Sequence, residues 1–180
     1  GGVDQLKRLL EFFGQGAQQY MSDAGVKICT VEKPERLRPN TATISWLGTE
    51  LGINIPPGAV NHPATGTCTP MFPPGVTEIH ILRSWPHMHL LGKRMTSTII
   101  RSDGTRVPMH SGNGWPFDFN NEISHETDFI LKPGDRVETT CYYDNPQAIA
   151  VGVGFENRYE MCFNFVTAYP AKALINKGFI

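Results

Sequence analysis

Short runs of apolar, β-branched and aromatic residues alternate with clusters of proline and glycine along most of this chain. Such runs predict β-strands, because branched and aromatic side chains fit the pleated, half-buried surface of a sheet. We expect strands at Val26–Val31, Ala42–Leu47, Val60–Thr67, Glu78–Trp85, Arg94–Arg101, Glu126–Leu131, Arg136–Tyr143 and Cys162–Tyr169.

Turn sequences separate these runs, at Ile55-Pro56-Pro57-Gly58, Pro73-Pro74-Gly75, Ser102-Asp103-Gly104 and Lys132-Pro133-Gly134-Asp135. Asp103-Gly104 between Ile99-Ile100 and Val107 predicts a hairpin. The polar, aromatic stretch from His110 to Ser124 is interpreted as a long loop. Many short strands at regular spacing predict an all-β fold, an antiparallel jelly-roll β-sandwich.

The first residues have a different pattern. Apolar side chains recur with helical spacing at Leu6, Leu9, Leu10 and Phe13. We therefore predict one N-terminal helix within Val3–Met21, which either packs on the sheet or serves as a leader. The chain is divided into residues 1–21 and a single β-sandwich domain, residues 22–180, which is long enough to bury a substantial core.

Composition narrows the classes of partner. The net charge of −1 gives no basis for binding nucleic acid through bulk electrostatics. No run of about 18 apolar residues is present to form a membrane span. The chain opens at Gly1-Gly2 without a methionine, so it is a processed protein or a piece of a longer one.

The four cysteines are widely spaced, at Cys29, Cys68, Cys141 and Cys162, and none forms a Cys-x-x-Cys pair. This spacing argues against a zinc knuckle and fits two disulfides in an oxidising compartment, so we expect a secreted or periplasmic protein. Buried free thiols are the alternative. Spacing alone leaves three pairings open.

The candidate chemistry lies in the stretch from His80 to Gly92, which contains the pair His87-Met88-His89. On a strand, side chains two residues apart point to the same face, so the two imidazoles would lie a few Å apart. Two neutral imidazoles suit zinc, copper, iron or nickel. Surface histidines on a solvated strand are the alternative interpretation.

Met161 is the third candidate ligand, although a methionine is more commonly a core residue. A thioether is a poor ligand for zinc or magnesium and a good one for copper, especially Cu(I). The adjacent Cys162 would fix Met161 in space if it formed a disulfide with Cys141. The bond would close a loop of 21 residues, worth about 3 kcal/mol in the chain-entropy model.

Three stretches occur in one order: His80–Gly92, Lys132–Cys141, and Glu160-Met161-Cys162-Phe163-Asn164 followed by Tyr169-Pro170. Together they resemble the C-terminal catalytic domain of the copper type II, ascorbate-dependent monooxygenases. The resemblance extends from about Ser22 to Ala173 and implies a jelly-roll sandwich that holds the oxygen-binding copper. It implies that His87, His89 and Met161 are the metal ligands and the catalytic residues.

In that family, dioxygen at this copper abstracts a hydrogen atom from an activated C–H bond of a small organic substrate, which is hydroxylated. Ascorbate supplies the electrons, and one of them is stored on a second copper in a preceding domain. That domain contains a His-His pair, which this chain lacks, and His62, His110 and His125 are scattered. The resemblance therefore implies either a second copper-binding domain outside this sequence or a one-domain relative whose copper does something else.

The resemblance also implies a Cys141–Cys162 disulfide, and pairing the remaining cysteines predicts Cys29–Cys68. His80 matches a position that does not bind metal, so we expect a buried, hydrogen-bonded structural histidine there.

Trp85 stands where the peptide-processing branch of the family has an arginine, and Phe165 stands where it has an aromatic hydroxyl. These departures favour an apolar or aromatic small substrate, with Trp85, Phe163 and Phe165 lining its pocket; core packing is the alternative for these three residues. The predicted function is that of a copper monooxygenase domain. The rivals are a non-catalytic copper-binding module for storage, sensing or delivery, and a structural sandwich that binds no metal.

Overall fold

The computed structural model of this protein describes residues 43–48, 50–113 and 125–171. Its strands are β1 (Thr43–Leu47), β2 (Asn54–Ile55), β3 (His62–Cys68), β4 (Ile79–His87), β5 (Gly92–Ile100), β6 (Arg106–Asn113), β7 (His125–Leu131), β8 (Arg136–Tyr143), β9 (Val151–Gly152) and β10 (Phe163–Tyr169). The predicted helix within Val3–Met21 and the predicted strand Val26–Val31 lie outside the described residues. The proposed domain boundary after residue 21 stays a prediction.

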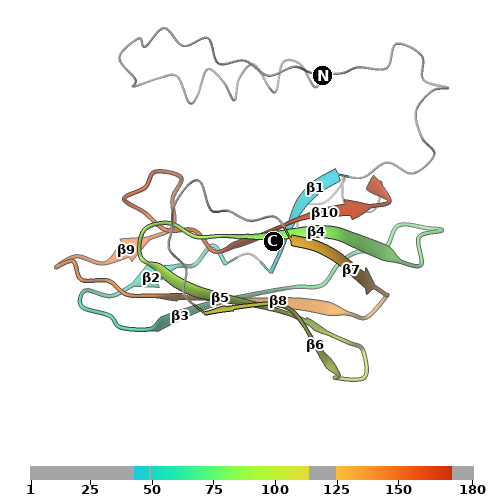
Figure 1. The fold of residues 1–180 in the computed structure, drawn as a ribbon, viewed down its shortest axis with the longest axis horizontal. Coiled ribbons are helices and arrows are strands. Elements are labelled where there is room, and N and C mark those ends of the chain that lie inside the picture. The colour runs from blue at the N-terminus through green and yellow to red at the C-terminus, as the bar shows by residue number, and fades with distance from the viewer. Residues whose placement is uncertain (1–42, 49, 114–124, 172–180) are drawn as a thin grey trace, which may run out of the picture. The chain divides into compact units, whose positions relative to one another are not determined.

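Eight of the strands form two four-stranded antiparallel sheets, which lie one above the other in Figure 1. One sheet has the order β1-β10-β4-β7 and the other has the order β3-β8-β5-β6. Consecutive strands alternate between the sheets except at the β5–β6 hairpin, which is the arrangement of a jelly roll. The predicted all-β, antiparallel jelly-roll β-sandwich is confirmed.

Seven predicted strands correspond to β1, β3, β4, β5, β7, β8 and β10, with ends that differ by at most two residues. The predicted loop from His110 is wrong in its first part, because β6 continues to Asn113 and pairs with β5 along its whole length. β6 is an edge strand, and an edge strand needs no continuous apolar pattern. The short pair β2–β9 was also missed, because two residues are too few to create a pattern.

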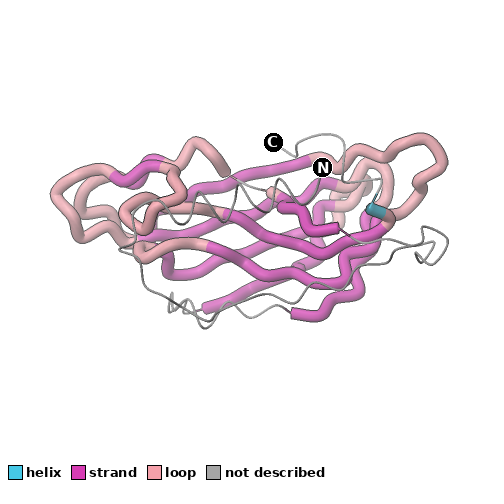
Figure 2. Tube along the Cα trace, turned by 90° about the horizontal axis from the view of Figure 1, so that it is seen from above, coloured by secondary structure: helices cyan, strands magenta, loops and turns pink. Residues whose placement is uncertain are grey.

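The predicted turns are confirmed. Gly58, Gly75 and Gly134 have φ values of 66°, 78° and 91°, and each follows a proline. This is the arrangement of a type II turn, which needs a positive φ at its third position. In the hairpin turn, the N–H of Gly104 donates to the carbonyl of Arg101 at 2.9 Å. The turns and longer loops gather at the two ends of the sandwich, as Figure 2 shows.

A buried polar layer divides the core between the sheets. One apolar cluster includes Ile79, Ile81, Ile99, Val137 and Val166, and the other includes Met88, Met95, Cys141, Tyr143 and Cys162. On each of the four central strands β4, β5, β8 and β10, one buried polar residue stands between the clusters: Ser84, Ser97, Thr139 and Asn164. The sandwich therefore has two apolar cores, and the candidate ligands adjoin the second.

The polar layer is satisfied mostly within itself. The hydroxyl of Ser84 donates to Asn164 Oδ1 at 2.6 Å, and the hydroxyls of Ser97 and Thr139 lie 2.8 Å apart. Thr139 also donates to the carbonyl of Leu47 at 3.2 Å, which ties its strand to β1 of the facing sheet. Within the described part of the chain, Asn164 Nδ2 is the one buried side-chain nitrogen or oxygen without a hydrogen-bond partner.

We predict that Ser84→Ala lowers the free energy of unfolding by about 1–3 kcal/mol, because it leaves the buried amide of Asn164 without its hydrogen bond. Adding Asn164→Leu should recover most of this loss, since both polar partners are then replaced by apolar groups. Urea unfolding of the two single variants and the double variant measures the effect. Ser102→Ala, in an exposed turn, is the control. Equal losses in the single and double variants would contradict this account of the layer.

Candidate metal centre

The stretch His87-Met88-His89 lies at the end of β4, where the chain turns toward β5. Met88 is fully buried and belongs to the second core cluster, so it anchors the stretch from the inside. Gly92 closes the turn, and a Cβ there would come within 2.7 Å of the Met88 side chain. β4 extends two residues beyond the predicted end at Trp85 and stops at His87, so His89 belongs to the connection and the strand alternation assumed for the pair does not reach it.

The two imidazoles nevertheless lie close together. Their ring centroids are 5.2 Å apart, and their planes are nearly perpendicular, at 89°. An imidazole nitrogen binds a zinc-like ion at about 2.0–2.1 Å, so two rings that share one ion have centroids roughly 5–6 Å apart. The observed spacing fits a single metal ion between them.

A hydrogen bond determines which nitrogen of His89 can bind a metal. Nδ1 of His89 lies 2.9 Å from the carbonyl oxygen of Tyr159. Because a carbonyl oxygen only accepts, Nδ1 carries the proton and the lone pair of the neutral ring is on Nε2. A donated N–H of this kind commonly orients a metal-ligating histidine. The His89 side chain is almost fully buried, with 3% of its surface exposed.

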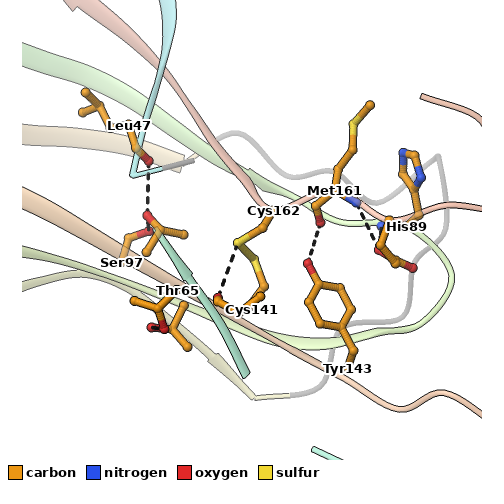
Figure 3. The surroundings of a disulfide bond; sticks show 12 residues. Leu47, Thr65, His89, Ser97, Cys141, Tyr143, Met161 and Cys162 are labelled. Atoms are coloured by element: carbon orange, nitrogen blue, oxygen red, sulfur yellow. Dashed lines mark hydrogen bonds between the residues drawn. A yellow bond between two sulfur atoms is a disulfide. The ribbon is translucent and has the colours of Figure 1, made fainter. Parts of the chain in front are cut away.

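Met161 reaches the same region from the neighbouring strand. It precedes β10, whose Phe163 is paired with His87 of β4. In Figure 3 the side chains of Met161 and His89 extend in the same direction from their backbones. Met161 has 7% of its surface exposed but belongs to neither apolar core cluster. The pairing of β4 with β10 therefore brings the backbone of Met161 next to the segment that carries the two histidines.

Two further contacts hold the Met161 backbone (Figure 3). The predicted Cys141–Cys162 disulfide is present, with its Cα atoms 5.8 Å apart, and it joins β8 of one sheet to the residue that precedes β10 of the other. The hydroxyl of Tyr143 donates to the Met161 carbonyl at 2.7 Å. Burial, and secondarily the charge of Glu160, raises the pKa of Tyr143, so the phenol keeps its proton.

Cys68 differs from the expectation. It is a buried free thiol, and the predicted Cys29–Cys68 disulfide is not formed in this structure; Cys29 lies outside the described residues. The thiol is packed in the first core cluster, where its sulfur accepts a hydrogen bond from the Gly48 N–H at 3.2 Å. Burial raises the pKa of the Cys68 thiol, which keeps it protonated and unreactive.

Glu160, beside Met161, has no role in the sequence-based prediction, but the structure places it at the centre. Its side chain is fully buried and accepts hydrogen bonds from the backbone N–H groups of His89, Leu91 and Met161. Burial raises the pKa of its carboxyl to about 7, and the three N–H donors act in the opposite direction. A glutamate between a tyrosine and a methionine carries no local signal of burial, so only the tertiary structure discloses this arrangement.

The three predicted pocket residues lie together beside His87. Trp85 stacks on Phe165 at 5.7 Å, and the His87 ring is 5.7 Å from Phe165 and 6.5 Å from Phe163. All are half-buried and none belongs to either core cluster. We call Trp85, Phe163 and Phe165 the aromatic group. It lies on the face of the β4–β10 pair that points away from the core, so core packing does not explain it.

The other histidines are placed differently. His80 is half-buried, stacks on Tyr169 at 4.4 Å and lies 3.6 Å from Glu78, so it is not the fully buried residue that we expected. His62, His110 and His125 lie on β3, β6 and β7. Among the residues whose side chains are described, no three or more His, Cys, Asp or Glu side chains gather to bind a metal. Of the predicted ligands, the Met161 thioether is therefore the candidate that would complete a three-residue site with His87 and His89.

Two imidazoles and one thioether form a donor set that favours copper, and the jelly roll presents it at one end of the β4–β10 pair. The fold and donor set thus define a β-sandwich domain suited to copper. The family described as copper type II ascorbate-dependent monooxygenase, C-terminal domain, matches residues 40–176, and the chain belongs to this family. Copper and ascorbate are the cofactors of the family.

Several curated proteins are similar to the chain. The dopamine beta-hydroxylase of Rattus norvegicus is 31% identical over 159 residues, which cover 80% of this chain and 25% of the relative. The dopamine beta-hydroxylase of Homo sapiens is 24% identical over 199 residues, which cover 95% of this chain and 32% of the relative. The DBH-like monooxygenase protein 1 of Gallus gallus is 26% identical over 124 residues, which cover 65% of this chain and 20% of the relative. The chain thus spans a third or less of the length of these relatives. Within the part of the chain that the structure describes, there is no helix long and apolar enough to span a bilayer.

We predict that the double variant Cys141→Ser, Cys162→Ser lowers the free energy of unfolding by about 3 kcal/mol, because the bond closes a loop of 21 residues. Urea unfolding with and without a reducing agent measures this loss. The reductant should destabilise the wild-type protein by a similar amount and leave the double variant unchanged. A wild-type midpoint that does not respond to full reduction would contradict a stabilising role for the bond.

Proposed function

We propose that this domain binds copper through His87, His89 and Met161, and that with dioxygen it hydroxylates an activated C–H bond of a small organic substrate. The observation that carries the proposal is the pair of imidazoles 5.2 Å apart, one of which presents Nε2 because its Nδ1 donates to a backbone carbonyl. Copper bound there would supply the redox chemistry that reduces dioxygen.

The residues of the chain contribute position and environment. The disulfide and the Tyr143 hydroxyl hold the Met161 backbone, and the Tyr159 carbonyl orients the His89 ring. A thioether favours the cuprous state, in which copper is able to react with dioxygen. Because His89 and Met161 are nearly buried, they would shield a bound metal from water on their side, which restricts side reactions.

The aromatic group supports an apolar or aromatic substrate. Trp85 and Phe165 form a half-buried stacked surface beside the His87 ring. A flat aromatic molecule would lie on such a surface by stacking, with its reacting carbon near the metal. The hydroxylase names of the similar proteins agree with C–H hydroxylation, whereas a non-catalytic copper module is not favoured by these comparisons.

The electron supply and the compartment complete the proposal. Ascorbate is the electron donor, and a second copper-binding domain, N-terminal to this one in the parent protein, stores one electron. The short span of the chain relative to its relatives is consistent with this arrangement. A secreted or periplasmic location is proposed because the Cys141–Cys162 bond requires an oxidising compartment.

We predict that His87→Ala and Met161→Ile each weaken Cu(I) binding at least tenfold and leave the fold intact, because each removes one ligand. A Cu(I) titration against a competing chelator measures affinity, and X-ray absorption counts nitrogen and sulfur ligands. The wild-type protein should bind one copper with two nitrogen ligands and one sulfur ligand.

His80→Ala, on the same strand, and Met71→Ile, at an exposed methionine, are the matched controls and should bind copper like the wild-type protein. Unchanged affinity in both ligand variants, or a wild-type site without sulfur, would rule out the assigned centre.

A further inference from the structure

The Glu160 carboxylate lies between the two segments that carry His89 and Met161. Its Oε2 accepts from the His89 N–H at 2.8 Å and from the Met161 N–H at 3.3 Å, and its Oε1 accepts from the Leu91 N–H at 2.6 Å. One side chain therefore contacts the backbone of both candidate ligands and of the turn between β4 and β5. The side chain has no exposed surface, so water does not compete for these bonds.

The number of donors explains why a carboxylate occupies this position. Three backbone N–H groups converge on it, and an ionised carboxylate has two oxygens that only accept hydrogen bonds. A glutamine has the same shape, but its amide nitrogen donates. Whichever way the amide is turned, at least one of the three N–H groups then faces another donor, and a buried unsatisfied donor is costly.

The backbone of Glu160 is itself fixed from the opposite side. Its N–H donates to the carbonyl of Gly152 at 2.9 Å, and its carbonyl accepts from the N–H of Gly154 at 3.1 Å. Gly154 has to be a glycine, because a Cβ there would come within 2.6 Å of the Tyr159 ring. β9 and the residues after it thus hold the backbone of Glu160, and the Glu160 carboxylate in turn holds the β4–β5 turn through its hydrogen bonds.

We propose that Glu160 is a positioning residue, which sets the separation and orientation of His89 and Met161 for a soft metal ion. The inference rests on the proposed copper site, but it concerns a residue that contacts no metal. The Glu160 bonds place the backbone of His89 while the Tyr159 carbonyl, one residue earlier, orients its ring. Residues 159–161 therefore control both the position and the tautomer of His89, and they also include the third ligand.

The test is the variant Glu160→Gln, with Glu156→Gln as the matched control. Glu156 lies on the same connection, is exposed, and is paired with Arg158 at the surface. Three quantities are measured: the nitrogen-15 shifts of the His89 ring in the metal-free protein, the affinity for Cu(I), and the copper–sulfur contribution in X-ray absorption. The unfolding midpoint is recorded alongside them.

We expect Glu160→Gln to release the fixed Nδ1–H tautomer of His89, to lower the Cu(I) affinity at least tenfold and to weaken the copper–sulfur contribution. Glu156→Gln should change none of these. If Glu160→Gln does not fold, Glu160→Asp serves the same test, because it keeps the charge but shortens the reach by one methylene.

A purely structural role predicts a different result, a lower unfolding midpoint with the tautomer, the affinity and the sulfur ligand unchanged; that result would overturn the inference. A wild-type protein that binds no Cu(I) would instead overturn the proposed copper site, and with it the role of Glu160 in metal binding. The two failures are distinguishable because the wild-type titration reports on the site and the variants report on Glu160.

Discussion

The antiparallel pairing of β4 with β10 is the constraint on which the rest of the structure depends. His87 and Phe163 are opposite one another in this pairing although they are far apart in the sequence. The register determines which residues share the outer face, where the aromatic group lies, and which enter the core, such as Val166. A shift of one residue would move every side chain of β10 to the opposite face.

Several separate interactions protect this register near the candidate ligands. The Cys141–Cys162 bond joins the start of β10 to the facing sheet, and the bond from Ser84 to Asn164 joins β4 to β10 inside the core. The buried polar layer adds specificity, because a slip would leave its hydroxyl and amide groups unpaired in an apolar environment. The sandwich is therefore most strongly cross-linked next to the candidate metal centre.

The sandwich was predictable from local features of the sequence, and the three candidate ligands were selected from their residue types, their spacing and the family resemblance. Strands and turns follow from β-branched runs and from proline–glycine pairs, and His87 and His89 are recognisable by their spacing. The burial of Glu160 was not predictable, because it depends on N–H groups some 70 residues earlier, which only the β4–β10 pairing brings near. For the same reason, the sequence did not show that strand geometry stops between His87 and His89: the Glu160 carboxylate accepts the N–H groups of His89 and Leu91 in place of a strand partner.

The two histidines differ in how far they are covered by the chain, and this has a consequence for the proposed centre. His89 is bonded to residues 159 and 160 and is almost completely buried, and Met161 shares the Glu160 carboxylate with it. His87 is the last residue of β4, and its half-buried ring packs beside Phe163 and Phe165. A substrate that stacks on the aromatic group would therefore contact the His87 ring, whereas the chain covers His89 and Met161. In the proposed centre, His87 is thus the candidate ligand that faces the substrate.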